Sequence, residues 1–249
     1  MPDSKKTHSQ LIIDFPARPE YCFSNFVVYQ GSEIAFAAAN EICAGGNIPY
    51  SALYISGERG LGKTHLLISI GNSLAKNLPA KKTLYLRCDD FIRNAGSAGS
   101  SSANESLSRL ADVDYLLMDN IDQISGHALA QEKLYYIYNA VTERGGKIVF
   151  AGRLAPEQMS ATESFLKSRF NWGMTASIMR MDDAASSRVV KKLCRDVDLR
   201  ISDKIIAFML NRIRRDYPSF KNAVAKINQE SFTRKSKVTL PLVKEALAL

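Results

Sequence analysis

Residues 57–64, GERGLGKT, have the types and the spacing of a phosphate-binding turn. Glycines in the pattern G-x-x-x-x-G-K-[ST] let backbone N–H groups turn inward around phosphate oxygens. Lys63 can reach the terminal phosphates of a nucleotide, and the Thr64 hydroxyl can bind a magnesium ion. A glycine turn arising by chance is the alternative, but this turn follows a strand pattern and opens a helix pattern, where the helix dipole attracts anions. The stretch therefore predicts a nucleotide site.

A second candidate for this site is Asp119, which follows the apolar run Tyr115-Leu116-Leu117-Met118. A strand of this kind delivers a carboxylate to the carboxyl edge of a parallel sheet, where magnesium would lie beside the phosphate turn. A strand-end acid that caps a turn is the alternative. The next residue is Asn120, whose amide cannot act as a base but can orient a water molecule. We therefore expect a metal-binding pair of Thr64 and Asp119 and little hydrolysis.

The elements that must position these residues alternate between strand and helix patterns. Strands are predicted over residues 52–55, 83–87, 115–119, 147–151 and 176–181. Helices are predicted over residues 33–44, around Leu66–Leu78 and around Leu134–Val141. Residues 94–106 have the composition of a flexible loop. This alternation predicts an α/β fold with a parallel five-stranded sheet and helices on both of its faces.

The strand patterns end near residue 181, and helical patterns follow. Ser202 is predicted to cap one helix, and Thr239 with Pro241 opens the last one. We therefore predict three parts: a mobile tail over residues 1–20, a nucleotide-binding α/β domain over 21–180 and a small all-α domain over 181–249.

The net charge of +8 is concentrated in the C-terminal part of the chain. Residues 181–249 hold 15 Lys and Arg against 8 Asp and Glu, a net charge of +7. This surplus favours an acidic partner, either nucleic acid or an acidic protein surface, although a solvated helical face would look the same. No apolar run approaches the roughly 18 residues that span a membrane, and no secretory signal is apparent, so we expect a cytoplasmic protein without membrane contact. We read the four cysteines as reduced thiols and predict neither disulfides nor a structural metal.

Three stretches resemble the DnaA-like AAA+ proteins: residues 60–67, GLGKTHLL; residues 23–28, FSNFVV; and residues 168–175, SRFNWGMT. In that family the first binds the nucleotide phosphates, the second lines the adenine pocket and the third carries an arginine finger. The resemblance covers roughly residues 21 to 249 and implies an AAA+ P-loop sheet with an all-α lid, holding ADP or ATP with Mg²⁺. The nucleotide-binding residues that it implies are Phe26, Val27, Val28, Gly57, Gly60, Leu61, Gly62, Lys63, Thr64 and His65.

Residues 239–245, TLPLVKE, are similar to the C-terminus of the Hda type, the short relatives that switch the initiator DnaA off. That type also has Asp-Asn at the position of Asp119-Asn120 and lacks the initiator's DNA-binding domain; here the sequence ends at Leu249. The resemblance implies that Arg169 acts in trans on a neighbouring DnaA, with self-association through the same face. The protein itself would bind ATP or ADP with weak or no ATPase activity.

Residues 10–15, QLIIDF, fit the sliding-clamp-binding peptide of the Hda type. In an extended peptide alternate side chains point the same way, so Leu11, Ile13 and Phe15 can enter one apolar groove while Gln10 anchors the start. The alternative is a tail strand that packs on the body of the protein.

Two further departures from the initiator bear on hydrolysis. Ala151-Gly152-Arg153 replaces a polar sensor after the fourth strand, and Pro218 stands where the lid presents an arginine, unless Arg214 or Arg215 substitutes. Two other functions remain open: a DnaA-like origin factor that binds DNA through the basic lid, and an ATPase of the helicase-loader type.

Overall fold

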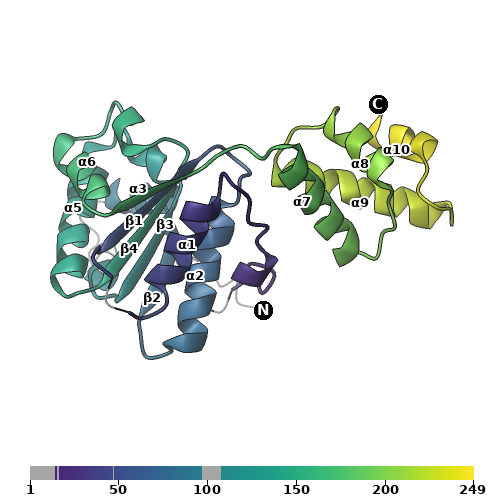
Figure 1. Cartoon of the computed structure of the whole chain (residues 1–249). Coiled ribbons are helices and arrows are strands. Elements are labelled where there is room, and N and C mark those ends of the chain that lie inside the picture. The colour runs from purple at the N-terminus through teal and green to yellow at the C-terminus, as the bar shows by residue number, and fades with distance from the viewer. Residues whose placement is uncertain (1–14, 16, 47, 97–107) are drawn as a thin grey trace, which may run out of the picture. The chain divides into compact units, whose positions relative to one another are not determined.

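The computed structural model describes residues 15, 17–46, 48–96 and 108–249 (Figure 1). Contacts divide the chain into two compact units. The first comprises the described residues of Met1–Phe26, Ile34–Gly57 and Lys63–Ser177, and the second comprises Val27–Glu33, Glu58–Gly62 and Ile178–Leu249. The boundaries predicted at residues 20 and 180 stay predictions.

A five-stranded sheet forms the centre of the first unit, which confirms the predicted fold class. Its strands are β1 (Ala52–Gly57), β2 (Thr83–Arg87), β3 (Tyr115–Asp119), β4 (Lys147–Gly152) and β5 (Met174–Ile178), in the order β2-β3-β4-β1-β5. The registers of β1 with β4, β4 with β3 and β3 with β2 are parallel. Parallel strands end at one edge, so Asp119 lies opposite Arg87 and Ala151 at the edge where β1 also ends.

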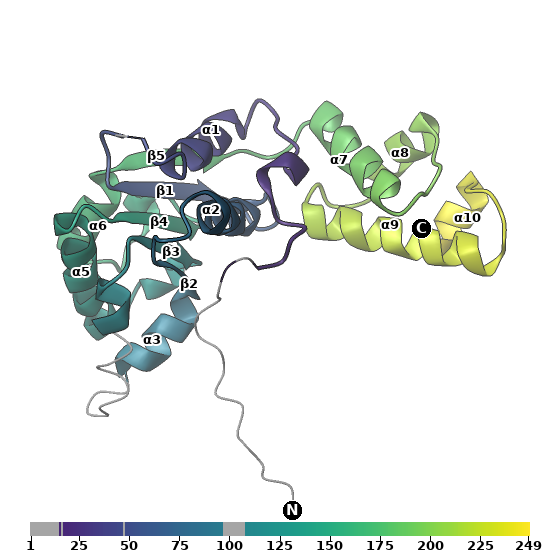
Figure 2. The ribbon, with the colours of Figure 1, turned by 90° about the horizontal axis from the view of Figure 1, so that it is seen from below.

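Helices cover both faces of this sheet, as Figure 2 shows. They are α1 (Glu33–Ile42), α2 (Lys63–Asn77), α3 (Cys88–Gly96), α5 (Ala128–Glu143) and α6 (Ser164–Asn171), with 3-10 turns at Phe23–Asn25, Ile121–Ile124 and Pro156–Gln158. α1 and α2 lie on one face, and α3, α5 and α6 on the other. Because both faces are covered, every residue of β3 is buried, which explains its continuous apolar run.

An aromatic cluster fixes α6 against the sheet. Phe170 of α6 packs against Tyr54 of β1 and Phe150 of β4, with ring centroids 5.4 and 4.8 Å apart. All three side chains are fully buried. Such rings stabilise a core through large apolar areas and edge-to-face contacts. Arg169, next to Phe170, is thereby held at a fixed place on α6.

The sequence prediction was wrong at two places in this unit. Residues 94–96 were predicted to belong to a loop, but they end α3, whose buried face comprises Cys88, Phe91 and Ala95. The small residues after that face hid the helix, and the rest of the predicted loop lies outside the described residues. β5 begins and ends earlier than predicted, at Met174 and Ile178.

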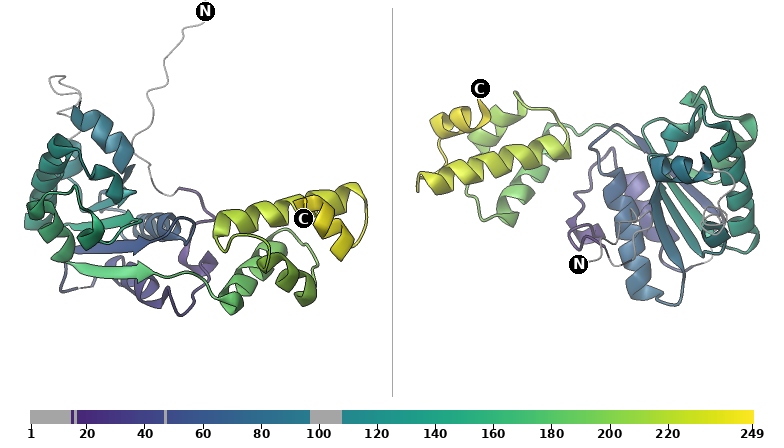
Figure 3. Two further views of the ribbon diagram at one scale, coloured as in Figure 1. Left: turned by 90° about the horizontal axis from the view of Figure 1, so that it is seen from above. Right: turned by 180° about the vertical axis from the view of Figure 1, so that it is seen from behind.

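The helices of the second unit are α7 (Asp183–Asp196), α8 (Asp203–Leu210), α9 (Tyr217–Thr233) and α10 (Leu240–Leu247) (Figure 3). Thr239 caps α10 as predicted, because its hydroxyl accepts from the Leu242 N–H at 3.5 Å. Ser202 occupies the N-cap of α8, but its side chain makes no cap hydrogen bond. Among the described residues no helix is long and apolar enough to cross a membrane.

Candidate functional site

The phosphate-binding turn joins the end of β1 to the start of α2. Gly60 has φ +83° and Gly62 φ +102°, conformations that glycine adopts without the steric cost of a Cβ. Lys63 is the first residue of α2 and is 7% exposed. Its Nζ donates a hydrogen bond to the Gly57 carbonyl oxygen at 2.6 Å. The Lys63 ammonium group therefore lies against the first residue of the predicted phosphate-binding turn.

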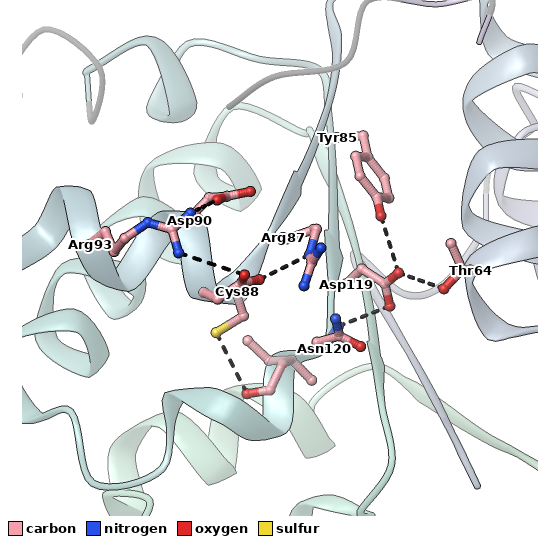
Figure 4. Close-up of polar contacts among 10 residues, drawn as sticks. Thr64, Tyr85, Arg87, Cys88, Asp90, Arg93, Asp119 and Asn120 are labelled. Carbon is pink, nitrogen blue, oxygen red and sulfur yellow. Dashed lines mark hydrogen bonds and ion pairs between the residues drawn. The ribbon is translucent and has the colours of Figure 1, made fainter. Parts of the chain in front are cut away.

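The Asp119 carboxylate lies at the centre of three hydrogen bonds (Figure 4). The Thr64 hydroxyl donates to Oδ2 at 2.6 Å, the Tyr85 hydroxyl donates to the same oxygen at 3.1 Å, and the Asn120 N–H donates to Oδ1 at 2.9 Å. Asp119 is 3% exposed. The structure therefore brings the two predicted magnesium residues together. A hydroxyl and a carboxylate at a phosphate-binding turn are oxygen ligands that suit Mg²⁺, which keeps several of its waters.

Tyr85 was not anticipated from the sequence. Burial, and then the Asp119 charge, raise the pKa of Tyr85, so its hydroxyl stays protonated and donates to the carboxylate. Tyr85 reaches Asp119 because β2 pairs with β3 in a register that sets Arg87 opposite Asp119. The only signal in the sequence was a tyrosine inside a predicted strand, which does not reveal a partner on another strand.

Two of the residues that we expect to limit hydrolysis, Asn120 and Arg153, have distinct surroundings. Asn120 has φ +56°, a left-handed conformation that asparagine adopts more readily than most residues. In the part of the chain that the structure describes, its amide side chain makes no hydrogen bond. Arg153 is held by Asp122, which accepts from the Arg153 N–H at 2.7 Å and from Nε at 3.2 Å. Arg153 is therefore engaged with the loop that follows β3.

The predicted adenine-pocket residues fall in both compact units. In the first, the Phe26 ring stacks on Phe36 and meets His65 edge-on, with centroids 5.7 and 5.4 Å apart. In the second, the Val28 carbonyl oxygen accepts a hydrogen bond from Arg188 at 3.3 Å. Phe26 therefore has its contacts within the first unit, and Val28 has its contact within the second.

Pro218 stands where the lid of the initiator presents an arginine, and it lies in the first turn of α9. Within the second unit the Tyr217 N–H donates to the Gly60 carbonyl oxygen at 3.1 Å, and a Cβ added at Gly60 would lie 2.9 Å from Pro218 Cδ. The start of α9 therefore contacts the turn residue itself. Arg214 pairs with Asp216 at 3.5 Å, and Arg215 pairs with Asp183 at 2.5 Å.

Arg169 lies in a different cluster, formed by α5 and α6. Its Nε donates to the Asn139 side-chain oxygen at 3.0 Å, and its Nη2 donates to the Tyr135 hydroxyl at 3.4 Å. Its guanidinium carbon lies 4.0 Å from the Trp172 ring centroid, with Tyr135 and Tyr138 at 5.1 and 6.0 Å. Cation–π contacts of this kind hold a guanidinium without neutralising its charge.

The surface beside Arg169 is open and combines aromatic and aliphatic side chains with two carboxylates. A groove of about 610 Å³ is lined by Ala128, Leu129, Glu132, Tyr135, Tyr136, Glu163 and Phe165. Tyr136 is 61% exposed and Trp172 70% exposed. Exposed aromatic residues together with arginine are typical of a protein–protein interface. The tyrosines of α5 were a signal that the sequence reading did not use.

The two clusters are separate. In the described residues the Arg169 side chain donates hydrogen bonds only to Asn139 and Tyr135, and α6 covers the face of the sheet opposite α2. Of the predicted clamp-binding residues, Gln10, Leu11 and Ile13 lie outside the described residues. The Phe15 ring lies against Gly71 of α2. The mobile tail over residues 1–20 stays a prediction.

Comparisons with known proteins agree with this arrangement. The family model of the bacterial DnaA ATPase domain matches residues 17–177, and that of the Hda lid domain matches residues 183–247. Domain III of the replication initiation protein DnaA from Thermotoga maritima is 26% identical, with a TM-score of 0.84 over 94% of this chain and 98% of that one. AMPPCP-bound DnaA from Aquifex aeolicus is 25% identical, with a TM-score of 0.78 over 87% of this chain and 67% of that one. The RuvB branch migration motor of Thermotoga maritima, 15% identical with a TM-score of 0.67 over 92% of this chain and 71% of that one, shares the fold.

Proposed function

The chain belongs to the family of the bacterial DnaA ATPase domain and has an Hda-type lid, and from this premise we propose that it switches DnaA off. It binds its own adenine nucleotide, docks on the DNA sliding clamp and stimulates ATP hydrolysis by a neighbouring DnaA. The separation of Arg169 from the Thr64–Asp119 pair carries this proposal.

The protein's own nucleotide is ADP or ATP, held with Mg²⁺. Lys63 would contact the terminal phosphates, and Thr64 with Asp119 would hold the metal, which supplies positive charge beside the phosphate oxygens. The AMPPCP bound to the Aquifex aeolicus DnaA supports an adenine nucleotide in this fold. Asn120 offers no carboxylate base next to this pair, so intrinsic hydrolysis is weak or absent.

Arg169 acts on the neighbour's nucleotide. Its guanidinium is oriented by Asn139 and by the rings of the exposed Trp172 and the half-buried Tyr135. Only two of its five N–H groups make hydrogen bonds among the described residues. In a second protein that covers this face, a nucleotide phosphate could accept hydrogen bonds from the remaining N–H groups of Arg169. Arginine fingers of this kind raise phosphoryl-transfer rates by about a thousandfold or more.

The test is phosphate release from ATP-bound DnaA in the presence of DNA-loaded clamp and this protein. Arg169→Ala should abolish the stimulation, a loss of about a thousandfold for an arginine finger. Lys167→Ala, on the same helix, is the matched control and should keep it. Equal stimulation by wild type and Arg169→Ala would reject the mechanism.

A DNA-binding function remains a second candidate, because residues 181–249 carry a net charge of +7. Several of these cations are already paired, among them Lys191 with Asp203 and Arg234 with Glu245. A salt-sensitive gel shift with the isolated protein would favour this candidate. Turnover by the protein alone, lost in Lys63→Ala, would instead favour a helicase-loader type of ATPase.

A further inference from the structure

Gly71 lies in the middle of α2 and is buried. Glycine inside a helix is less stable than alanine by about 0.5–1 kcal/mol, so a buried glycine there calls for a packing reason. The reason is the aromatic ring of Phe15: a Cβ added at Gly71 would overlap that ring. The missing side chain therefore leaves a notch on α2 that the phenyl ring of Phe15 occupies.

Asn72, the next residue of α2, binds the backbone that follows Phe15. Its Oδ1 accepts from the Ala17 N–H at 2.7 Å, and its Nδ2 donates to the Ala17 carbonyl oxygen at 2.8 Å. The same Nδ2 donates to the Tyr21 carbonyl oxygen at 2.9 Å. One amide thus satisfies both backbone groups of Ala17, much as a neighbouring strand would. The ring in the notch and the paired backbone fix this segment at two adjacent points.

We propose that Gly71 and Asn72 form an internal binding site for the aromatic end of the clamp-binding peptide, residues 10–15. The inference rests on the proposed clamp docking, in which the same Phe15 ring enters the apolar groove of the clamp. One ring cannot fill both places, so the protein's own helix and the clamp compete for Phe15. Clamp docking then requires Phe15 to leave α2 first.

Competition of this kind has a measurable consequence for affinity. When only a fraction of the protein has Phe15 released, the apparent dissociation constant for the clamp rises by the inverse of that fraction. A closed-to-open ratio of about ten would make the full chain bind the clamp about tenfold more weakly than its own peptide does. Disrupting the notch while leaving Phe15 in place should restore the affinity of the free peptide.

The experiment compares the clamp affinities of a synthetic peptide of residues 5–20, the wild-type chain, Gly71→Ala and Asn72→Ala by calorimetry. The added methyl group of Gly71→Ala excludes the ring while favouring the helix, and Asn72→Ala releases Ala17 without adding an atom. Both variants should bind like the peptide, about tenfold more tightly than wild type. Gly96→Ala in α3, where an added Cβ meets nothing within 4 Å, is the matched control and should bind like wild type.

Hydrogen exchange at the Ala17 amide measures directly whether the hydrogen bond from Ala17 to Asn72 is formed. The amide should be protected in wild type, and protection should fall in Gly71→Ala and on adding saturating clamp. If the peptide binds the clamp but wild type and both variants bind equally, the inference is overturned while clamp docking stands. If the peptide fails to bind the clamp, clamp docking itself is overturned and the competition with it.

Discussion

Asp119 is 3% exposed and accepts hydrogen bonds from Thr64 and Tyr85, whereas Arg169 lies against Trp172, which is 70% exposed. The first charge is surrounded by donors from its own chain, at an edge of the sheet next to the phosphate turn. The second is oriented by one amide and by aromatic faces and keeps donors for another molecule. This difference supports the proposal that the Asp119 cluster binds the protein's own nucleotide and that Arg169 acts on a partner.

The largest effect expected on the first cluster comes from Lys63→Ala. A hydrogen bond to a charged group contributes about 1.5–3 kcal/mol, so loss of the ammonium should weaken adenine-nucleotide binding by about 100-fold. Calorimetry with ADP and Mg²⁺ measures this loss. Arg169→Ala should change the same affinity by less than about twofold, because the Arg169 side chain contacts α5 on the other face of the sheet. A comparable loss in Arg169→Ala would show that the two clusters are not independent.

Asn139→Ala should leave the Arg169 guanidinium less well oriented, because Asn139 accepts the hydrogen bond from its Nε. Losing the Nε hydrogen bond, worth about 1.4 kcal/mol, should lower the maximal stimulated rate of DnaA hydrolysis about tenfold. Nucleotide binding by the protein itself should not change. Thr142→Ala, one turn further along α5, serves as the control. If Asn139→Ala changes only the concentration needed for half-maximal stimulation, Asn139 binds the partner and does not position Arg169.

Tyr85→Phe should have a smaller effect, and only on the nucleotide affinity that depends on Mg²⁺. Removing the hydroxyl that donates to Asp119 Oδ2 should weaken Mg²⁺-dependent nucleotide binding about fivefold, which corresponds to the roughly 1 kcal/mol net contribution of a typical hydrogen bond. Binding measured in EDTA should stay the same. Tyr115→Phe on the neighbouring strand provides the comparison, since no hydrogen bond of its hydroxyl is found among the described residues. Equal weakening with and without Mg²⁺ would place Tyr85 outside the metal site.

Asn120→Gly should have the smallest effect of all. Glycine adopts the left-handed conformation of Asn120 without strain, and an amide is not a base, so intrinsic ATP hydrolysis should change by less than about twofold. Single-turnover hydrolysis with radiolabelled ATP is the measurement. A drop of about tenfold or more would mean that the Asn120 amide orients the attacking water.

Much of the fold and part of the site could be predicted from residue patterns within short stretches of the sequence. The bounds of β2 and β3 were predicted to the residue. β3 is a continuous buried run that ends at Asp119, and in β2 the apolar residues 84–86 lie between the polar Thr83 and Arg87. α3 was missed because its buried face alternates with small and polar residues that resemble a loop. The meeting of Thr64 with Asp119 was predicted because parallel strands present their carboxyl ends at one edge.

The sequence by itself determined the phosphate turn, the strand that ends at Asp119 and the arginine motif at residue 169, because each depends on residues close together in the chain. The tertiary structure decided that Tyr85 holds Asp119, that Asn139 orients Arg169 and that Phe15 fills the notch at Gly71. These pairs lie far apart in sequence. Strand register and helix packing bring them together, and both are properties of the folded chain as a whole.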